Sequence, residues 1–163
     1  MRLPHILLLL ALVAALAFWL LRDDSEAQVR QAHADLAEFF FTAEEDSTTN
    51  LSVLDLRRLQ SLFAEDVSVI GEPDDFTASY TRSEIVGLIV DLRGSFVRSE
   101  LRLQDLGVEF PEPDLAVVRF AATMEAVFRD GDRLLEAMEV ESRMRDVDGR
   151  WQFFSFEISQ RPP

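Results

Sequence analysis

An uninterrupted apolar run near the N-terminus constrains this chain more than any other feature. Ile6–Leu21 contains 16 residues without a charged or polar side chain, and Arg22 follows it directly. A membrane-spanning helix needs roughly 20 apolar residues, with about 17 as the lower limit. We therefore expect residues 1–24 to form a signal anchor or transmembrane helix. Residues 25–160 then form one folded domain, and residues 161–163 form a tail.

A cleavable signal peptide is the alternative, because Ala15–Ala17 has the small-x-small pattern of a cleavage site. The apolar run continues past that pattern to Leu21, which favours a retained anchor. Arg2 before the run and Arg22 after it nearly balance, so the positive-inside rule gives little guidance on orientation. The usual behaviour of signal anchors predicts a single pass through the bacterial inner membrane, with the domain on the periplasmic side.

Charge and composition narrow the function classes. The net charge is −14, all 16 basic residues are Arg, and Cys is absent. An acidic surface of this kind repels nucleic acid, so we expect no nucleic-acid partner. The sequence contains no Gly-rich phosphate loop, no Ser-His-Asp set and no cluster of metal ligands. We therefore expect no catalytic residues, no cofactor and no metal.

Apolar periodicity predicts three helices in the first half of the domain. Beyond Ser25, which we expect to cap the first helix, apolar residues recur at three- and four-residue spacing, as in an amphipathic helix. They are Val29, Ala32, Leu36, Phe39, Phe40 and Ala43. A second helix follows Asn50, and Val67–Ile70 reads as a short strand. A third helix is expected over Glu84–Leu92, with Ser83 as its cap.

The second half reads as a meander of long antiparallel strands. Apolar residues occupy every even position of Leu115–Phe128, which is a strong strand pattern. A three-residue loop Arg129–Gly131 would pair Phe120 with Val140 and Arg119 with Glu141.

Two further details of the sheet follow from the same patterns. The same loop type at Val147–Gly149 would pair Val140 with Phe156. Near Gln104–Asp105 the apolar residues change from odd to even positions along the strand. One extra residue there would keep them on one face, which predicts a β-bulge that bends the sheet.

Two segments, Leu62–Val69 and Asp148–Gln152, resemble parts of the nuclear transport factor 2-like superfamily. Leu62–Val69 looks like its junction between the second helix and first strand, and Asp148–Gln152 looks like the turn entering its last strand. The resemblance covers about Ala27–Gln160. It implies an α+β cone, in which three helices pack on a strongly curved antiparallel sheet and enclose a pocket. Ketosteroid isomerases of this type use an Asp base and an oxyanion-hole Tyr. Here the base position falls in Ile70–Glu72, and the first helix has no Tyr.

Five residues are candidates for the pocket. His33 could act as a base near neutral pH, although a histidine on the flank of its helix is the simpler interpretation. Glu136 is the one carboxylate on an inward strand face, opposite Met124, and a solvated rim position is its simpler interpretation. Tyr80 and Ser142 could supply hydrogen bonds.

The outer face of the sheet is the candidate interface. Aromatic and Arg side chains are expected to lie together on this face, and both are enriched in protein interfaces. The candidate residues are Trp151, Phe153, Arg145, Arg143, Arg119 and Leu135.

These observations leave three functional hypotheses. The first is a non-enzymatic, membrane-tethered accessory domain of a bacterial envelope complex, which binds a protein partner or a second copy of itself through the outer sheet face. The second is a pocket protein that binds a small hydrophobic ligand, or acts on it as an isomerase, cyclase or lyase. The third is an envelope assembly factor similar to the periplasmic subunits of type IV secretion.

Overall fold

A computed structural model describes residues 3–42, 51–72 and 76–160. Its first element is a single helix, α1 (Leu3–Phe39), which runs through Ser25 without a break. Ser25 therefore caps nothing, and the expected boundary at residue 24 is not a break in the secondary structure. The reason is local: between Pro4, in the first turn, and Phe39 there is no Gly or Pro to end the helix.

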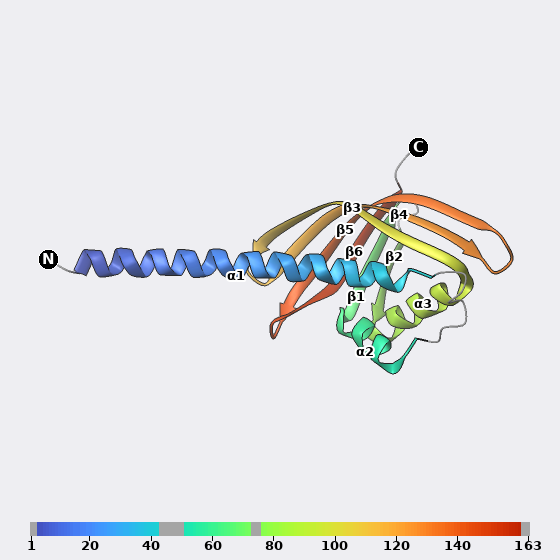
Figure 1. The fold of residues 1–163 in the computed structure, drawn as a ribbon, viewed down its shortest axis with the longest axis horizontal. Helices are drawn as coiled ribbons and strands as arrows, with labels where there is room; N and C mark the ends of the chain where they lie inside the picture. The colour runs from blue at the N-terminus through green and yellow to red at the C-terminus, as the bar shows by residue number, and fades with distance from the viewer. Residues whose placement is uncertain (1–2, 43–50, 73–75, 161–163) are drawn as a thin grey trace.

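The first half of α1 projects beyond the sheet, and its second half lies across the sheet (Figure 1). In the part of the chain that the structure describes, no helix has both the length and the apolar character needed to cross a membrane. The predicted transmembrane anchor at residues 1–24 is therefore not supported.

Two short helices complete the helical layer. Helix α2 (Val53–Ser61) has Ser52 as its N-cap, and the Ser52 hydroxyl accepts a hydrogen bond from the backbone N–H of Asp55. In return, the Asp55 carboxylate accepts a hydrogen bond from the backbone N–H of Ser52. Helix α3 (Arg82–Ser95) begins with the same reciprocal arrangement between Thr81 and Glu84. Thr81, and not the predicted Ser83, is the cap. Both are capping boxes, which satisfy backbone donors that a helix start leaves unpaired.

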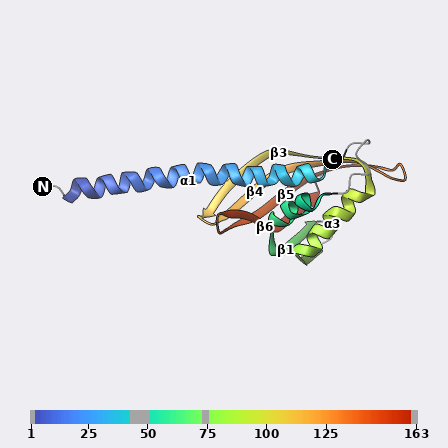
Figure 2. The same cartoon turned by 60° about the horizontal axis from the view of Figure 1, so that its bottom comes forward.

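Six strands form one sheet in the order β2-β1-β6-β5-β4-β3. Their bounds are β1 (Phe63–Glu72), β2 (Phe76–Thr81), β3 (Phe96–Glu112), β4 (Leu115–Phe128), β5 (Arg133–Val147) and β6 (Arg150–Gln160). The antiparallel meander from β3 to β6 is confirmed. The pairing of β1 with β6 is parallel, which the prediction of a purely antiparallel sheet did not include. The three helices lie over one face of this curved sheet (Figures 1 and 2).

The predicted register between β4 and β5 is confirmed. Phe120 pairs with Val140 and Arg119 with Glu141. The connecting loop has three residues, and Gly131 adopts a φ of +94°, a left-handed conformation that costs glycine least. The predicted bulge in β3 is also present, because the pairing shifts between Gln104 and Gly107, where Asp105 has a φ of +57°.

The predicted register between β5 and β6 is wrong. Val147 pairs with Arg150, so the turn contains only Asp148 and Gly149, with φ values of +54° and +78°. Positive φ at both central residues is typical of the two-residue hairpin turn that Asp-Gly favours. A bulge then shifts the pairing between Arg143 and Met144. Val140 consequently pairs with Ile158, and not with Phe156.

This shorter turn reverses the face of the first residues of β6. Trp151 and Phe153 point inward, with 6% and 0% of their surfaces exposed. The Trp151 ring lies against Phe110 at 5.6 Å between ring centroids, and Phe153 belongs to the main core. The sequence analysis predicted that both residues belong to an interface on the outer face, and this prediction is wrong because both are buried on the inner face. Arg145 lies over the ring of Phe154, 5.4 Å from its centroid.

Candidate functional site

A cavity of about 320 Å³ lies between the helices and the inner face of the sheet. This volume is at the lower end of the range for small-molecule sites, roughly 300–1,000 Å³. The walls come from α1, α3 and the strands, and the surface they present is apolar. The lining includes Leu36, Phe40, Ile85, Ile89, Leu101, Ala122, Met124, Met138, Val140, Phe156 and Ile158.

Each element contributes to the cavity through its own periodicity. On α1, Leu36 and Phe40 are four residues apart and therefore lie on one side of the helix. On β5, Met138 and Val140 are two residues apart and point to the same side of the strand. The bulge at Asp105 lies in β3, beyond the lining residues Leu101 and Leu103.

Among the described residues of the cavity wall, His33 is the one that is titratable, and only 1% of its surface is exposed. Its Nδ1 lies 2.8 Å from the carbonyl oxygen of Val29, which can only accept a hydrogen bond, so Nδ1 carries the proton. Nε2 then has the free lone pair and accepts from the Ser142 hydroxyl at 2.7 Å. The ring also packs edge-on against Phe120 and Phe153, at centroid distances of 5.3 and 4.8 Å.

Burial lowers the pKa of His33 from 6.5 to about 4, and the hydrogen bond to Val29 offsets only part of that effect. His33 is therefore neutral at neutral pH. Both ring nitrogens are occupied, one by a backbone carbonyl and one by Ser142. The pair is a neutral polar contact inside an apolar wall, and the lone pair of Nε2 becomes available only when the Ser142 hydroxyl turns away.

The lowered pKa predicts a loss of stability in mild acid. The unfolded chain binds a proton at His33 near pH 6.5, whereas the folded chain does so only near pH 4. Unfolding therefore takes up a proton between these values, and the contribution to stability falls as the pH decreases through them. From about pH 7.5 to about pH 5 we expect a loss of about 2 kcal/mol from this group. Urea unfolding at both pH values measures it.

The control for this prediction is the double variant His33→Leu/Ser142→Ala. It removes both hydrogen-bonding partners together, so neither buried polar group is left unpaired. Its stability should change little over the same pH range. Carboxylates with lowered pKa values, such as Asp55 and Glu84, lose their contribution only below their ordinary values of 3.8 and 4.5. An equal loss in the double variant and the parent would contradict the assignment to His33.

The structure brings three of the five predicted pocket residues together. His33 and Met124 line the cavity, and Ser142 binds His33 from behind the wall. Glu136 pairs with Met124 as predicted, but it is exposed on β5 and does not line the cavity. Tyr80 is half-buried on β2 and also lies outside the lining. His33 is fully buried, so the interpretation as a histidine on the helix flank is wrong.

Sequence reasoning missed the contact between His33 and Ser142. Two signals were available to find it. His33 shares the apolar face of its helix with Val29 and Phe40, and Ser142 is a polar residue at an inward position of β5, between Val140 and Met144. Each is a lone polar side chain on an apolar face, and two such groups satisfy each other more readily than either is left unpaired.

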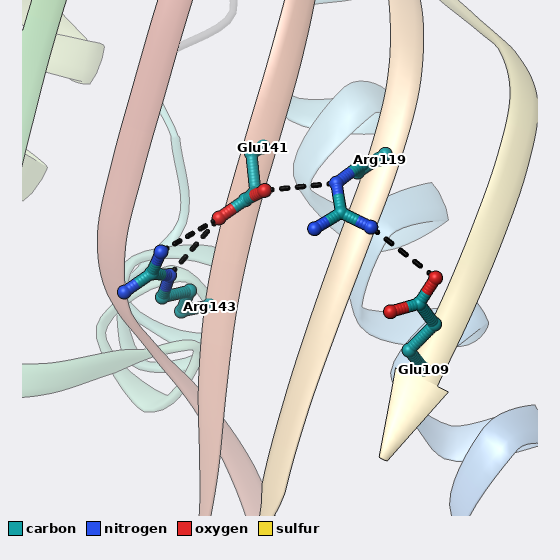
Figure 3. Close-up of polar contacts among 4 residues, drawn as sticks. All are labelled: Glu109, Arg119, Glu141 and Arg143. Carbon is teal, nitrogen blue, oxygen red and sulfur yellow. Dashed lines mark hydrogen bonds and ion pairs between the residues drawn. The ribbon is translucent and has the colours of Figure 1, made fainter. Parts of the chain in front are cut away.

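The outer face of the sheet carries paired charges. Glu109, Arg119, Glu141 and Arg143 form a continuous chain across β3, β4 and β5 (Figure 3). The nitrogen–oxygen distances along it are 3.2, 2.9 and 2.9 Å. Hydrogen bonds from Arg143 and Arg119 hold the pKa of Glu141 below its ordinary value.

The other predicted interface residues of this face are also exposed. Arg145 lies 4.0 Å from Asp114, and 70% of the Leu135 surface is exposed. Arg119, Arg143, Arg145 and Leu135 thus lie on the outer face as predicted, but three of them are arginines already matched by carboxylates.

Solved structures share this fold across most of the chain. A proposed scytalone dehydratase from Novosphingobium aromaticivorans is 15% identical, with a TM-score of 0.69 and coverage of 87% of both chains. A hexachlorocyclohexane dehydrochlorinase from Novosphingobium barchaimii is 16% identical, with a TM-score of 0.67 and coverage of 88% of this chain and 90% of that one. A proposed dehydratase of the NTF2-like family from Streptomyces avermitilis is 18% identical, with a TM-score of 0.65 and coverage of 87% and 99%.

No protein-family model matches the sequence, and a search of curated proteins finds no relative. The structural similarity therefore defines the class: an α+β cone of the nuclear transport factor 2-like, or cystatin-like, fold. At these identities it establishes the fold, and the fold implied by the resemblance of Leu62–Val69 and Asp148–Gln152 is confirmed.

Proposed function

We propose that the cone binds a small, uncharged hydrophobic molecule in the cavity beside His33. The observation that carries the proposal is the cavity itself, because its surface is apolar and His33, the one polar residue among its described lining residues, is already hydrogen-bonded. A charged ligand would lose its hydration there without gaining a partner, which is costly. An apolar ligand loses nothing comparable and buries its surface.

Titration calorimetry of the intact chain with 2-naphthol tests this proposal. We expect saturable binding of one molecule per chain, with a negative heat-capacity change from apolar burial. The matched control is 2-naphthalenesulfonate, which has the same ring system with a charge. Its affinity should be lower by about tenfold or more, because the cavity offers no group to pair with the sulfonate. Absence of saturable binding, or equal affinity for the two compounds, would contradict the proposal.

An acid–base enzyme is a second candidate. The structural neighbours include a dehydrochlorinase and proposed dehydratases, whose names describe elimination reactions. Elimination requires a base, and the basic nitrogen among the lining residues is Nε2 of His33. A pKa of about 4 makes it a weak base, since catalytic bases work best with a pKa near the working pH. We therefore favour binding over catalysis.

Mass spectrometry of a recovered ligand separates the two candidates. A molecule that co-purifies with the chain and keeps its mass after incubation in D₂O supports binding. A molecule that loses a small leaving group, or takes up deuterium in the parent but not in His33→Leu, supports acid–base catalysis. Native mass spectrometry of freshly purified protein supplies the ligand.

The accessory role predicted from the sequence has weaker support. Two of its interface residues, Trp151 and Phe153, are buried, and three arginines of the outer face, Arg119, Arg143 and Arg145, lie within ion-pair distance of carboxylates. A membrane tether with the domain on the periplasmic side stays a prediction from the apolar run Ile6–Leu21. Fractionation of cells that express the intact chain tests it.

A further inference from the structure

A second cleft, separate from the cavity, is lined by arginines that form no ion pair with a carboxylate of the described residues. It has a volume of about 540 Å³ and lies between the end of α2, the starts of β1 and α3, and the β5–β6 turn. Arg57, Arg82 and Arg150 line it, each from a different element, together with Gln60 and Gln152. Glu65 is the only acidic residue among the described residues of its wall.

Four arginines of the outer sheet face provide the contrast. Arg102, Arg119, Arg143 and Arg145 each lie within 4.0 Å of a carboxylate. Within residues 3–42, 51–72 and 76–160, no carboxylate forms an ion pair with any of the three cleft arginines. In a chain with a net charge of −14, three unmatched arginines at one concave site make a local positive field.

One side chain of the cleft, that of Arg82, is held in place before any ligand arrives. Arg82 is partly buried, and its Nε donates a hydrogen bond to the carbonyl oxygen of Phe63 at 2.8 Å. That bond fixes the guanidinium and leaves its terminal nitrogens available. Gln152 is 8% exposed and lines the cleft with its amide unpaired among the described residues. Fixed donors lose less conformational entropy when they bind a ligand.

We propose that this cleft binds a phosphate group. Three Arg and one Glu give the wall a formal charge of about +2, which matches the two negative charges of a phosphate monoester near neutral pH. Planar guanidinium groups donate paired hydrogen bonds to phosphate oxygens, and donors from three elements suit a tetrahedral group better than a planar carboxylate. The phosphate can belong to a soluble monoester or to a lipid headgroup.

The test compares two arginine pairs with the same change in charge. Arg57→Gln/Arg150→Gln removes two exposed cleft arginines. Arg98→Gln/Arg133→Gln removes two exposed arginines of β3 and β5 that lie outside the cleft. Each protein is titrated with phenyl phosphate, with benzoate and with dihexanoyl phosphatidic acid below its micelle concentration, all at matched ionic strength. Single Arg57→Gln and Arg150→Gln variants repeat the measurement, and circular dichroism verifies their fold.

We expect the parent chain to bind a phosphate probe saturably and more tightly than benzoate. The cleft pair should lower that affinity about tenfold or more, and the control pair should leave it nearly unchanged. Tighter binding of phenyl phosphate assigns the site to soluble monoesters, and tighter binding of the phosphatidic acid assigns it to a lipid headgroup. Equal losses in the two pairs, stronger binding of benzoate, or no saturable binding of either phosphate probe would overturn the proposal.

Discussion

Phe153→Ala is expected to destabilise the fold by about 3–5 kcal/mol, the usual cost of deleting a fully buried aromatic side chain. None of the Phe153 surface is exposed, and its ring contacts Phe63, Phe156 and His33. Deletion leaves a void between the sheet and the helices, because the surrounding side chains can close it only in part. Urea unfolding at neutral pH measures the loss.

The adjacent residue gives a matched control. Phe154 is half-buried on the outer face beneath Arg145. Phe154→Ala should cost about 1 kcal/mol or less, since surface substitutions rarely cost more. The two variants together test the register of β6, in which a two-residue turn and a bulge set which phenylalanine points inward. A larger loss of stability for Phe154→Ala than for Phe153→Ala would contradict this register and support the three-residue turn expected from the sequence.

Ala122→Phe is expected to abolish binding of 2-naphthol while the domain stays folded. Ala122 is 3% exposed and lines the cavity from the middle of β4. A phenyl ring at this position would occupy much of the space of about 320 Å³ that a ligand needs. Overpacking of a filled core costs about 1–3 kcal/mol, but here the added atoms enter an open volume. Calorimetry with 2-naphthol measures the loss.

Ala121→Phe is the control for this variant. Ala121 precedes Ala122 on the same strand and therefore points to the opposite face of the sheet, and it does not line the cavity. Its affinity for 2-naphthol should equal that of the parent. Retained binding in Ala122→Phe, or an equal loss in both variants, would place the ligand elsewhere.

The β4–β5 hairpin shows what the sequence could predict about the fold. Strict alternation over Leu115–Phe128 fixed the inward face, and only a three-residue loop brought both apolar faces together. The loop ending at Gly131 and the bulge at Asp105 followed from parity alone, and both are present.

The β5–β6 hairpin shows where parity reasoning fails. A short turn displaced the pairing of Trp151 and Phe153, and a bulge on the same strand then returned Phe156 and Ile158 to the inward face. The shorter turn and the bulge each shift the pairing of β6, and together they leave the apolar alternation at the end of the strand unchanged. The inward direction of Phe156 and Ile158 therefore agreed with the predicted turn, although that turn was wrong.

The candidate site was only partly accessible from the sequence. Its residue types could be found, because His33 and Ser142 are polar exceptions on apolar faces. The contact between His33 and Ser142 could not be predicted, because they are 109 positions apart in the sequence. The distance between their side chains depends on how α1 crosses the sheet. Glu136 also occupies an even position of β5, but it is exposed and does not line the cavity.

The most direct test of the central claim is a methyl NMR titration of the chain with 2-naphthol. If the cavity holds the ligand, the methyl signals of Met124, Met138 and Val140 should shift together and saturate at one molecule per chain. The Leu135 methyl signals, on the exposed outer face, should not move. Saturable shifts at Leu135 with unchanged signals from the three lining residues would contradict the account.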